Sequence, residues 1–417
     1  MPLFVSTDVS PDTPFATHVS GIFQGTTSGR VNGIAMDPSD DLVLYAAAEW
    51  SGVWKSIDGG KSWTQSSNGL RSGLTQKSGE TVIAVDADSK RILYLTQRKD
   101  GRGDAACTAD RFQCGHFGGL WVSTDAAATW KHVDPPGCPD PATYDVIAAG
   151  FSDGVAFVAT NSADCRLVAS GDSNLATWLK LPDPPVTNQY FQFVAAPGAT
   201  PTLFACQGGL VWRTVAPSSP NSWTALILPG NPSCDGLAAV PPSVTAPGPI
   251  GTPPTSSTVV ASASGPTPPQ NPGDSPGIRR EAYVADFNAS MVVDLGTYST
   301  DSGSGTQNVF VAPYRSPGPN LGPNVSYDVF AADTLRFWMY HAGNSWTPFD
   351  DVHADTWSMT FPRSYDPPNN RCTAFASNDG GIYVNRNGGG CAKNWVLASS
   401  GLSLLMTITL EGVSRPV

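Results

Sequence analysis

The chain has 417 residues, of which 14% are charged, and it carries 42 glycines, 37 prolines and a net charge of −11. This composition favours many short strands joined by turns over a helical protein. The negative charge argues against nucleic acid and anionic membranes as partners, and no apolar run approaches the roughly 20 residues of a membrane-spanning helix.

Apolar runs in chain order form units of four predicted strands. Each unit has an apolar strand, a polar or Pro-containing turn, a second apolar strand, a Gly-containing loop, a third strand, and a polar turn before a fourth strand that opens on Trp. The first unit has strands at 31–37, 42–48, 53–56 and 62–65, and the second at 82–86, 92–97, 120–123 and 129–133. Later units span 145–181, 191–228, 308–349 and 356–398. A period of about 40 to 45 residues with four strands each is typical of β-propeller blades.

A fifth unit is less certain from the sequence, because 241–276 is rich in Pro, Ser, Thr and Gly around a strand at 258–263. A disordered linker between two domains is the alternative. We interpret 1–417 as a single domain with loop insertions at 98–117 and 241–280.

The two ends of the chain also carry apolar segments, at 3–8 and 404–413. Pairing between them would close the ring and remove exposed strand edges. The sequence therefore predicts an all-β propeller of four-stranded antiparallel blades. It has eight blades if the fifth unit is real and seven if it is not; a piece of a longer propeller is a further alternative.

One motif recurs near the end of successive units. The first copy reads SIDGGKSW and contains Ser56, Asp58, Gly60 and Trp63; the later copies keep Ser123, Asp125 and Trp130, then Ser170, Asp172 and Trp178. An Asp in a tight turn accepts hydrogen bonds from backbone N–H groups, Gly supplies a positive φ, and Trp packs as an apolar plug. We therefore assign these residues structural roles.

The motif resembles the Asp-box (BNR) repeat of sialidase-like and sortilin-like β-propellers. The resemblance implies that these turns lie on the face away from the ligand, so that function belongs on the opposite face. A sialidase should contain an early Arg-Ile-Pro segment, which this chain lacks, so sialidase activity is not expected. The segments at 33–38 and 52–56 are similar to xyloglucanases, and those at 353–357 and 378–383 to bacterial sortilin-like repeat proteins.

Eight cysteines allow 105 pairings, but the blade topology restricts them. Sequential partners fall on the same face of the predicted propeller, which predicts the bonds Cys107–Cys114, Cys138–Cys165, Cys206–Cys234 and Cys372–Cys391. Such bonds indicate an oxidising compartment, so we expect a secreted or periplasmic protein. The absence of a CxxC motif or His cluster predicts no metal site, and no cofactor is expected.

Candidate functional residues lie in loops expected on the ligand face. The candidate catalytic carboxylates are Glu49, Asp104, Asp355 and Asp379, and the candidate ligand-binding residues are Arg30, Trp50, Arg111, His116, His353 and Asn378. We expect a module that binds a glycan or an extracellular protein. The alternatives are a glycoside hydrolase, which needs two of these carboxylates within about 10 Å, and an assembly module of an extracellular complex.

Overall fold

The computed structural model describes the central part of the chain with gaps. It covers residues 15–19, 23–27, 30–49, 51–70, 82–96, 118–138, 144–187, 191–198, 200–240, 257–267, 277–300, 308–313, 327–333, 336–341, 345–349, 352, 356–386 and 394–402. Apart from one 3₁₀ turn at Pro367–Asn369, these ranges contain strands and connections but no helix. The prediction of an all-β protein is confirmed.

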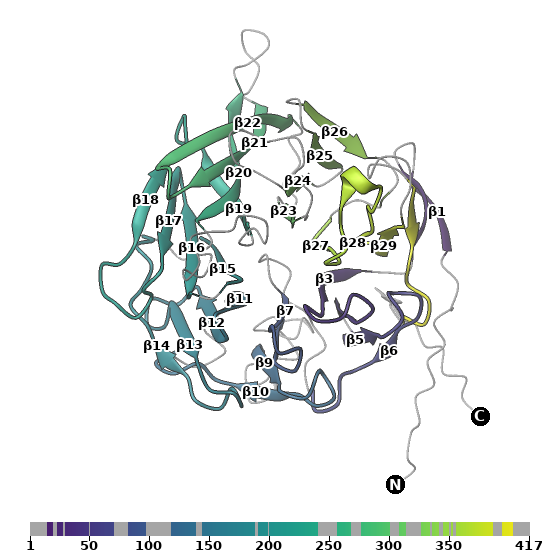
Figure 1. Ribbon diagram of the computed structural model, residues 1–417, viewed down its shortest axis with the longest axis horizontal. Coiled ribbons are helices and arrows are strands. Elements are labelled where there is room, and N and C mark those ends of the chain that lie inside the picture. The colour runs from purple at the N-terminus through teal and green to yellow at the C-terminus, as the bar shows by residue number, and fades with distance from the viewer. Residues whose placement is uncertain are drawn as a thin grey trace, which may run out of the picture.

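Seven four-stranded antiparallel sheets form a ring of blades, which Figure 1 shows along the ring axis. Blades one to three are β3 (Val31–Met36), β4 (Leu44–Ala48), β5 (Gly52–Ser56), β6 (Thr64–Gln65); β7 (Ile83–Val85), β8 (Ile92–Thr96), β9 (Gly119–Ser123), β10 (Lys131–Val133); β11 (Val146–Ser152), β12 (Val155–Thr160), β13 (Leu167–Ser170), β14 (Leu179–Lys180). Blades four and five are β15 (Gln192–Ala196), β16 (Thr202–Gln207), β17 (Leu210–Thr214), β18 (Thr224–Ile227); β19 (Ser233–Ala239), β20 (Thr258–Thr267), β21 (Gly277–Asp286), β22 (Met291–Ser299). Blades six and seven are β23 (Asn308–Pro313), β24 (Tyr327–Ala332), β25 (Phe337–His341), β26 (Ser345–Phe349); β27 (Ser358–Thr360), β28 (Ala374–Asn378), β29 (Gly381–Asn385), β30 (Trp395–Leu397).

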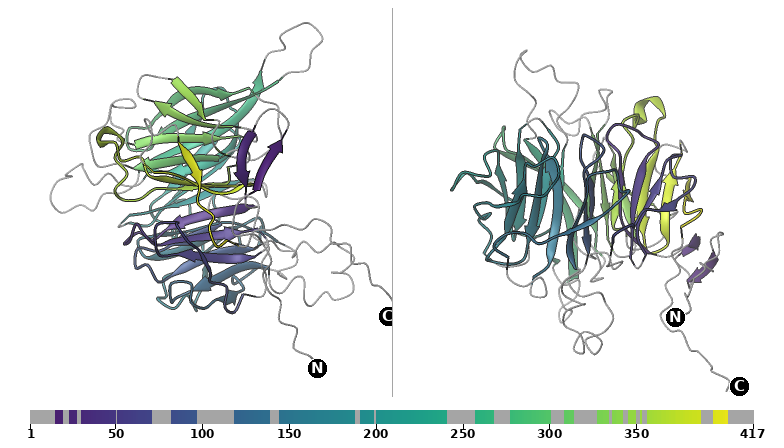
Figure 2. Two further views of the ribbon diagram at one scale, coloured as in Figure 1. Left: turned by 90° about the vertical axis from the view of Figure 1, so that its right-hand side faces the viewer. Right: turned by 90° about the horizontal axis from the view of Figure 1, so that it is seen from below.

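The strand order within each blade follows the chain order, and the first strand lies nearest the ring axis (Figure 1). A hairpin of β1 (Phe15–Val19) and β2 (Phe23–Thr27) forms a separate two-stranded sheet at the side of the ring (Figure 2). The predicted terminal strands at 3–8 and 404–413 lie outside the described residues.

The fifth unit is a full blade, and the strand predicted at 258–263 is part of its second strand, β20. Its first strand, β19, precedes the Pro-rich stretch, and β20 and the start of β21 lie inside the predicted 241–280 insertion. The blade count is nevertheless seven, which corrects our inference that a real fifth unit would give eight.

Blades seven and one are in direct contact, which closes the ring among the described residues; the predicted pairing of the terminal strands lies outside them. β3 packs against β27 and β28. The Trp63 backbone N–H donates to Ser400 O at 3.1 Å, and its indole donates to Ala398 O at 2.8 Å. Trp130 makes the same two bonds to Asn68 O and Ser66 O of blade one. Blade one therefore packs against blade seven in the same way as blade two packs against blade one.

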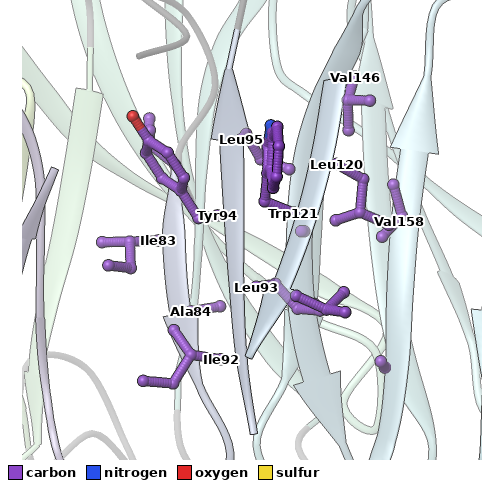
Figure 3. Close-up of a cluster of buried hydrophobic side chains, with 14 of the residues drawn as sticks. Ile83, Ala84, Ile92, Leu93, Tyr94, Leu95, Leu120, Trp121, Val146 and Val158 are labelled. Carbon is purple, nitrogen blue, oxygen red and sulfur yellow. The ribbon is translucent and has the colours of Figure 1, made fainter. Parts of the chain in front are cut away.

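The core lies between neighbouring blades, where both faces of each sheet are covered. In blade two Ile92, Leu93, Tyr94 and Leu95 are all 0% exposed, and Trp121 beside them is 2% exposed (Figure 3). A strand buried on both faces has no polar side, so it appears in the sequence as a continuous apolar run. This explains why the runs, and not alternating patterns, located the blades.

The repeated motif forms tight turns between the third and fourth strands of blades. The Asp58 carboxylate accepts hydrogen bonds from Lys61 N at 2.9 Å, Ser62 N at 3.0 Å and Ser56 Oγ at 2.8 Å. Asp125 repeats this arrangement with Ser123 and Thr129. Desolvation opposes ionisation of Asp58, but the hydrogen bonds from Ser62, Ser56 and Lys61 outweigh it and lower its pKa to about 2.

The second turn shows that the backbone conformation is retained without glycine. Gly59 and Gly60 have φ of 73° and 74°, and the corresponding Ala126 and Ala127 have φ of 56° and 68°. A positive φ is unfavourable for Ala, so the hydrogen bonds of the turn hold the alanines in this region. The third copy is looser, with Asp172 accepting from Asn174, Ala176 and Thr177 N.

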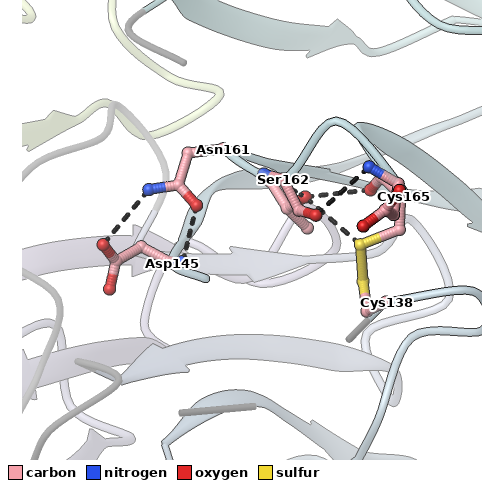
Figure 4. The surroundings of a disulfide bond; sticks show 7 residues. Cys138, Asp145, Asn161, Ser162 and Cys165 are labelled. Atoms are coloured by element: carbon pink, nitrogen blue, oxygen red, sulfur yellow. Dashed lines mark hydrogen bonds between the residues drawn. A yellow bond between two sulfur atoms is a disulfide. The ribbon is translucent and has the colours of Figure 1, made fainter. Parts of the chain in front are cut away.

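The two predicted disulfides whose cysteines both lie within the described residues are present. Cys138–Cys165 has its Cα atoms 4.9 Å apart and Cys206–Cys234 has them 6.1 Å apart. Figure 4 shows the first beside Asp145 and Asn161, whose side chains are hydrogen bonded at 3.2 Å. Cys372 is also disulfide-bonded, while Cys107, Cys114 and Cys391 lie outside the described residues.

Candidate functional site

The two faces of the ring carry different connections. We call the face with the starts of the innermost strands and the connections between second and third strands the loop-bearing face. The face with the Ser-x-Asp turns is the turn-bearing face. Arg30 precedes β3, Glu49 follows β4 and Asp379 follows β28, so the topology places all three on the loop-bearing face.

Arg30 joins blades one and seven on this face. Its guanidinium contacts Glu49 Oε1 at 3.1 Å within blade one and Asp379 Oδ2 at 2.5 Å from blade seven. Glu49 is 2% exposed, whereas Arg30 and Asp379 are 21% and 19% exposed. Arg30 and Asp379 are 349 positions apart in the chain and meet because the ring brings its first and last blades together.

Trp357 completes the cluster and lies immediately before β27. Its indole N–H donates to Asp379 Oδ1 at 2.8 Å, and the Arg30 guanidinium lies 5.6 Å from the ring centre. Its backbone N–H donates to Ser377 O, which fixes the segment against β28. We call Arg30, Glu49, Trp357 and Asp379 the junction cluster.

Asn378 and Asn32 are close in the chain to Asp379 and Arg30, respectively. The Asn378 side chain accepts from Gly380 N at 2.8 Å, so it shapes the turn that presents Asp379. Asn32 is 1% exposed, and neither polar atom of its amide has a hydrogen-bond partner among the described residues. An unpaired buried amide is costly, so this position offers both a donor and an acceptor to a bound water or ligand.

The electrostatics of the junction cluster are dominated by the arginine. Desolvation lowers the tendency of Arg30 to be charged, but hydrogen bonding and charge interactions with Asp379 and Glu49 outweigh it and raise its pKa. Arg30 is therefore a permanent cation that is shared by two carboxylates. With two carboxylates around one guanidinium, the cluster disfavours an anionic ligand.

The cluster can position a ligand better than it can transfer protons. Glu49 and Asp379 bind the same guanidinium, which keeps their nearest oxygens within about 8 Å, inside the spacing of glycosidase carboxylate pairs. However, the guanidinium lies between them, where a hydrolase needs the sugar bond. The half-buried indole of Trp357, by contrast, is held in one orientation by Asp379 and Arg30.

Part of this site was predictable from the sequence and part was not. Among the predicted residues, the structure brings Arg30, Glu49 and Asp379 together, with Asn378 beside them. The others, Trp50, Asp104, Arg111, His116, His353 and Asp355, lie outside the described residues. Trp357 was not a candidate, although it lies in the 353–357 segment that suggested a family resemblance.

In the described ranges, no three His, Cys, Asp or Glu side chains gather as a metal site would require. The same ranges contain no helix long and apolar enough to cross a membrane.

Comparisons with known proteins include matches to GH74 enzymes. A segment is 31% identical over 125 residues to the xyloglucanase Xgh74A of Acetivibrio thermocellus, covering 27% of this chain and 13% of that protein. An ancestral GH74 enzyme matches with a TM-score of 0.58 at 13% identity, over 91% of this chain and 48% of that one. The GH74 xyloglucanase from Xanthomonas campestris matches with a TM-score of 0.56 at 14% identity, over 92% and 55%.

These matches show the fold, and they cover only part of the proteins matched. The chain spans about half the length of the GH74 structures and a smaller part of the curated xyloglucanase. No protein-family model matches the chain. The protein is thus similar in structure to one part of GH74 enzymes, a group of propeller glycoside hydrolases.

Proposed function

We propose that this protein is an extracytoplasmic Asp-box β-propeller that binds a neutral polysaccharide of the xyloglucan type through its loop-bearing face. The observation that carries the proposal is the junction cluster, in which Arg30 and Asp379 hold the ring of Trp357 on that face. The likeness to xyloglucanases supports the choice of polysaccharide.

The Asp-box assignment is supported by the turns of blades one and two. Both have a Ser and an Asp two residues apart that share a hydrogen bond, a central residue with positive φ and a Trp bonded to the preceding blade. The extracytoplasmic location is supported by the disulfides, because such bonds persist mainly in oxidising compartments.

The neutral character of the ligand follows from charge. The whole chain carries −11, and the junction cluster holds two carboxylates around one cation. An anionic polymer would be repelled by both. A neutral sugar can stack its apolar face on an indole and place a hydroxyl against a carboxylate, which matches Trp357 and Asp379.

Hydrolysis is the second candidate function, and the similarity to GH74 enzymes favours it. It does not fit the pair Glu49 and Asp379, because Arg30 separates the carboxylates and Glu49 is almost fully buried. Two other candidates, Asp104 and Asp355, lie outside the described residues. Binding without cleavage by the junction cluster is therefore the function we propose.

The experiment is affinity electrophoresis and calorimetry with tamarind-type xyloglucan, together with an assay for released reducing ends. We expect binding by the wild type, and at least about tenfold weaker binding by Trp357→Ala, because it loses the stacking surface. Asp379→Asn should weaken binding less, because the indole of Trp357 is held less firmly in its orientation but is still present.

The matched control is Asp41→Asn, which removes an arginine-paired aspartate from the same two blades on the turn-bearing face. It should bind as the wild type does. An equal loss of xyloglucan binding in Asp41→Asn and Trp357→Ala would show a general folding defect and contradict the proposal. Release of reducing ends that Asp379→Asn abolishes would establish the hydrolase instead.

A further inference from the structure

A second feature of the loop-bearing face is a hollow of about 640 Å³ between blades four and five. Its lining includes Gln192 at the start of β15, Gln207 and Gly208 in the β16–β17 turn, and Asn231, Ser233 and Asp235 around the start of β19. In Figure 1 these strands lie across the ring from β28 and β29, so the hollow is separate from the junction cluster.

The walls of the hollow are fixed before any ligand arrives. Cys234 N donates to Gly208 O at 3.0 Å, and Leu228 N donates to Gly209 O at 2.8 Å. The disulfide Cys206–Cys234 joins the same two segments covalently. A preformed cavity of this size does not have to order loops on binding, which favours small ligands.

Gly208 and Gly209, the two glycines of the β16–β17 turn, differ in how much room a side chain would have. A Cβ on Gly209 would come within 2.1 Å of Asn231 Oδ1, so the Asn231 amide lies directly against this backbone. A Cβ on Gly208 would meet no atom within 4 Å, and Gly208 has φ of +55°. The backbone is thus tightly packed at one residue and open at the next.

The chemistry of the lining selects a neutral ligand with several hydroxyls. The polar side chains are amides, hydroxyls and one carboxylate, and no Lys, Arg or His is among the lining residues in the described ranges. Buried Trp212 and Phe191 supply an apolar part. Amides both donate and accept hydrogen bonds and a carboxylate accepts two, which suits vicinal hydroxyls, while an anion would find no cation.

Asp235 is oriented and supported by groups behind it. Its carboxylate is hydrogen bonded by Ser264 on β20, and the fully buried Arg280 on β21 stabilises its ionised form. Desolvation nevertheless raises its pKa. A carboxyl group held in one place at low exposure can accept a hydrogen bond from a sugar hydroxyl.

From these observations we infer that the hollow between blades four and five is a separate binding subsite for one neutral sugar unit. The inference rests on the proposed function for its ligand class, but not on the junction cluster. A polysaccharide chain or two of its branches would then contact the loop-bearing face on both sides of the ring.

The test uses Gly208→Asn, which places a side chain into the open space while keeping a residue that tolerates a left-handed φ. The matched control is Gly296→Asn, because Gly296 also has a positive φ, of +82°, and open space around it, but lies on β22 away from the hollow. The probes are D-xylose, D-glucose and a xyloglucan heptasaccharide, measured by protein-observed NMR titration of the intact chain.

We expect saturable shifts with at least one sugar probe, with affinity reduced at least about tenfold in Gly208→Asn and unchanged in Gly296→Asn. Asp235→Asn, which keeps the shape of the hollow, should weaken binding severalfold. Equal affinity of Gly208→Asn and the wild type for every probe, or no shifts with any sugar, would overturn the inference. Shifts with a peptide mixture that are lost in Gly208→Asn, in the absence of sugar binding, would also overturn it.

The two proposals fail separately. If Trp357→Ala retains polysaccharide binding and Gly208→Asn loses it, the hollow is supported and the junction cluster is not. If Trp357→Ala loses binding and Gly208→Asn does not, the hollow is not a subsite and the proposed function stands.

Discussion

Blades seven and one are joined by an arginine–aspartate pair on each face of the ring, and the two pairs differ in their surroundings. On the loop-bearing face Arg30 and Asp379 are 21% and 19% exposed and share their charges with the buried Glu49. On the turn-bearing face Arg363 and Asp41 are 53% and 27% exposed, at 3.2 Å. The same residue types at the same junction thus form a desolvated three-charge cluster on one side and a hydrated surface pair on the other.

The two pairs are expected to differ in how much they stabilise the fold. Water screens an exposed pair, so its removal costs little, whereas loss of one partner from a buried cluster leaves an uncompensated charge. Four variants test this difference, in decreasing order of expected effect.

Arg30→Met should have the largest effect. It keeps the aliphatic volume but leaves Glu49, which is 2% exposed, without its cation, at a cost of about 3 kcal/mol in the free energy of unfolding. Urea denaturation followed by tryptophan fluorescence measures this. Adding Glu49→Gln to Arg30→Met should restore most of the loss; a double variant as unstable as the single one would contradict the explanation.

Asp328→Asn examines a half-buried carboxyl for which no ion pair is found among the described residues. Among the described residues its polar partner is the Tyr365 hydroxyl, at 2.8 Å, and desolvation raises its pKa to about 6. The folded state therefore binds more protons than the unfolded chain between about pH 4 and 6, so the free energy of unfolding falls as pH rises through this range. We expect Asp328→Asn to remove this fall and to be up to about 2 kcal/mol more stable than the wild type at pH 7.

The measurement for Asp328→Asn is the urea midpoint at a series of pH values between 4 and 8. The curves of variant and wild type should converge near pH 4 and separate towards pH 7. A constant offset across the series would show that packing, and not ionisation, distinguishes them.

Asp58→Ala examines the turns that fasten the turn-bearing face. Loss of the hydrogen bonds from Ser56, Lys61 and Ser62 should cost about 1 kcal/mol at pH 7. Because the folded pKa of Asp58 is lowered to about 2, this stabilisation is present above about pH 4 and is lost as pH falls towards 2. The difference in thermal midpoint between wild type and variant should therefore shrink on acidification. Asp40→Ala is the control. It removes an aspartate on the same face whose carboxylate accepts one hydrogen bond, from the backbone N–H of Leu42.

Arg363→Met should have the smallest effect, about 0.5 kcal/mol or less, and addition of salt should reduce it further. Desolvation acts against ionisation of Asp41, but hydrogen bonds from Arg363 and Ser364 lower its pKa. Urea midpoints at low and high salt measure the contribution. A loss as large as that of Arg30→Met would mean that exposure does not distinguish the two junction pairs.

Much of the fold was predictable from local sequence. Strand positions followed from apolar runs such as 92–95, and the Ser-x-Asp turns followed from residue types with strong local preferences. Cys138–Cys165 and Cys206–Cys234 were predictable because the order of strands in a blade decides which loops share a face.

The site was only partly predictable. Arg30, Glu49 and Asp379 were candidates because of the face on which their loops fall. Their contact, and the role of Trp357 between them, were not visible, because side chains from opposite ends of the chain meet only where the ring closes.

The sequence by itself determined the all-β class, the four-strand repeat and the turns, because these depend on interactions within about 45 residues of the chain. The tertiary structure decided the number of blades, the way in which blade seven meets blade one, and the position of the hollow. The physical reason is that a repeat specifies each blade in the same way, while the number that closes a ring depends on the angle at which neighbouring blades pack.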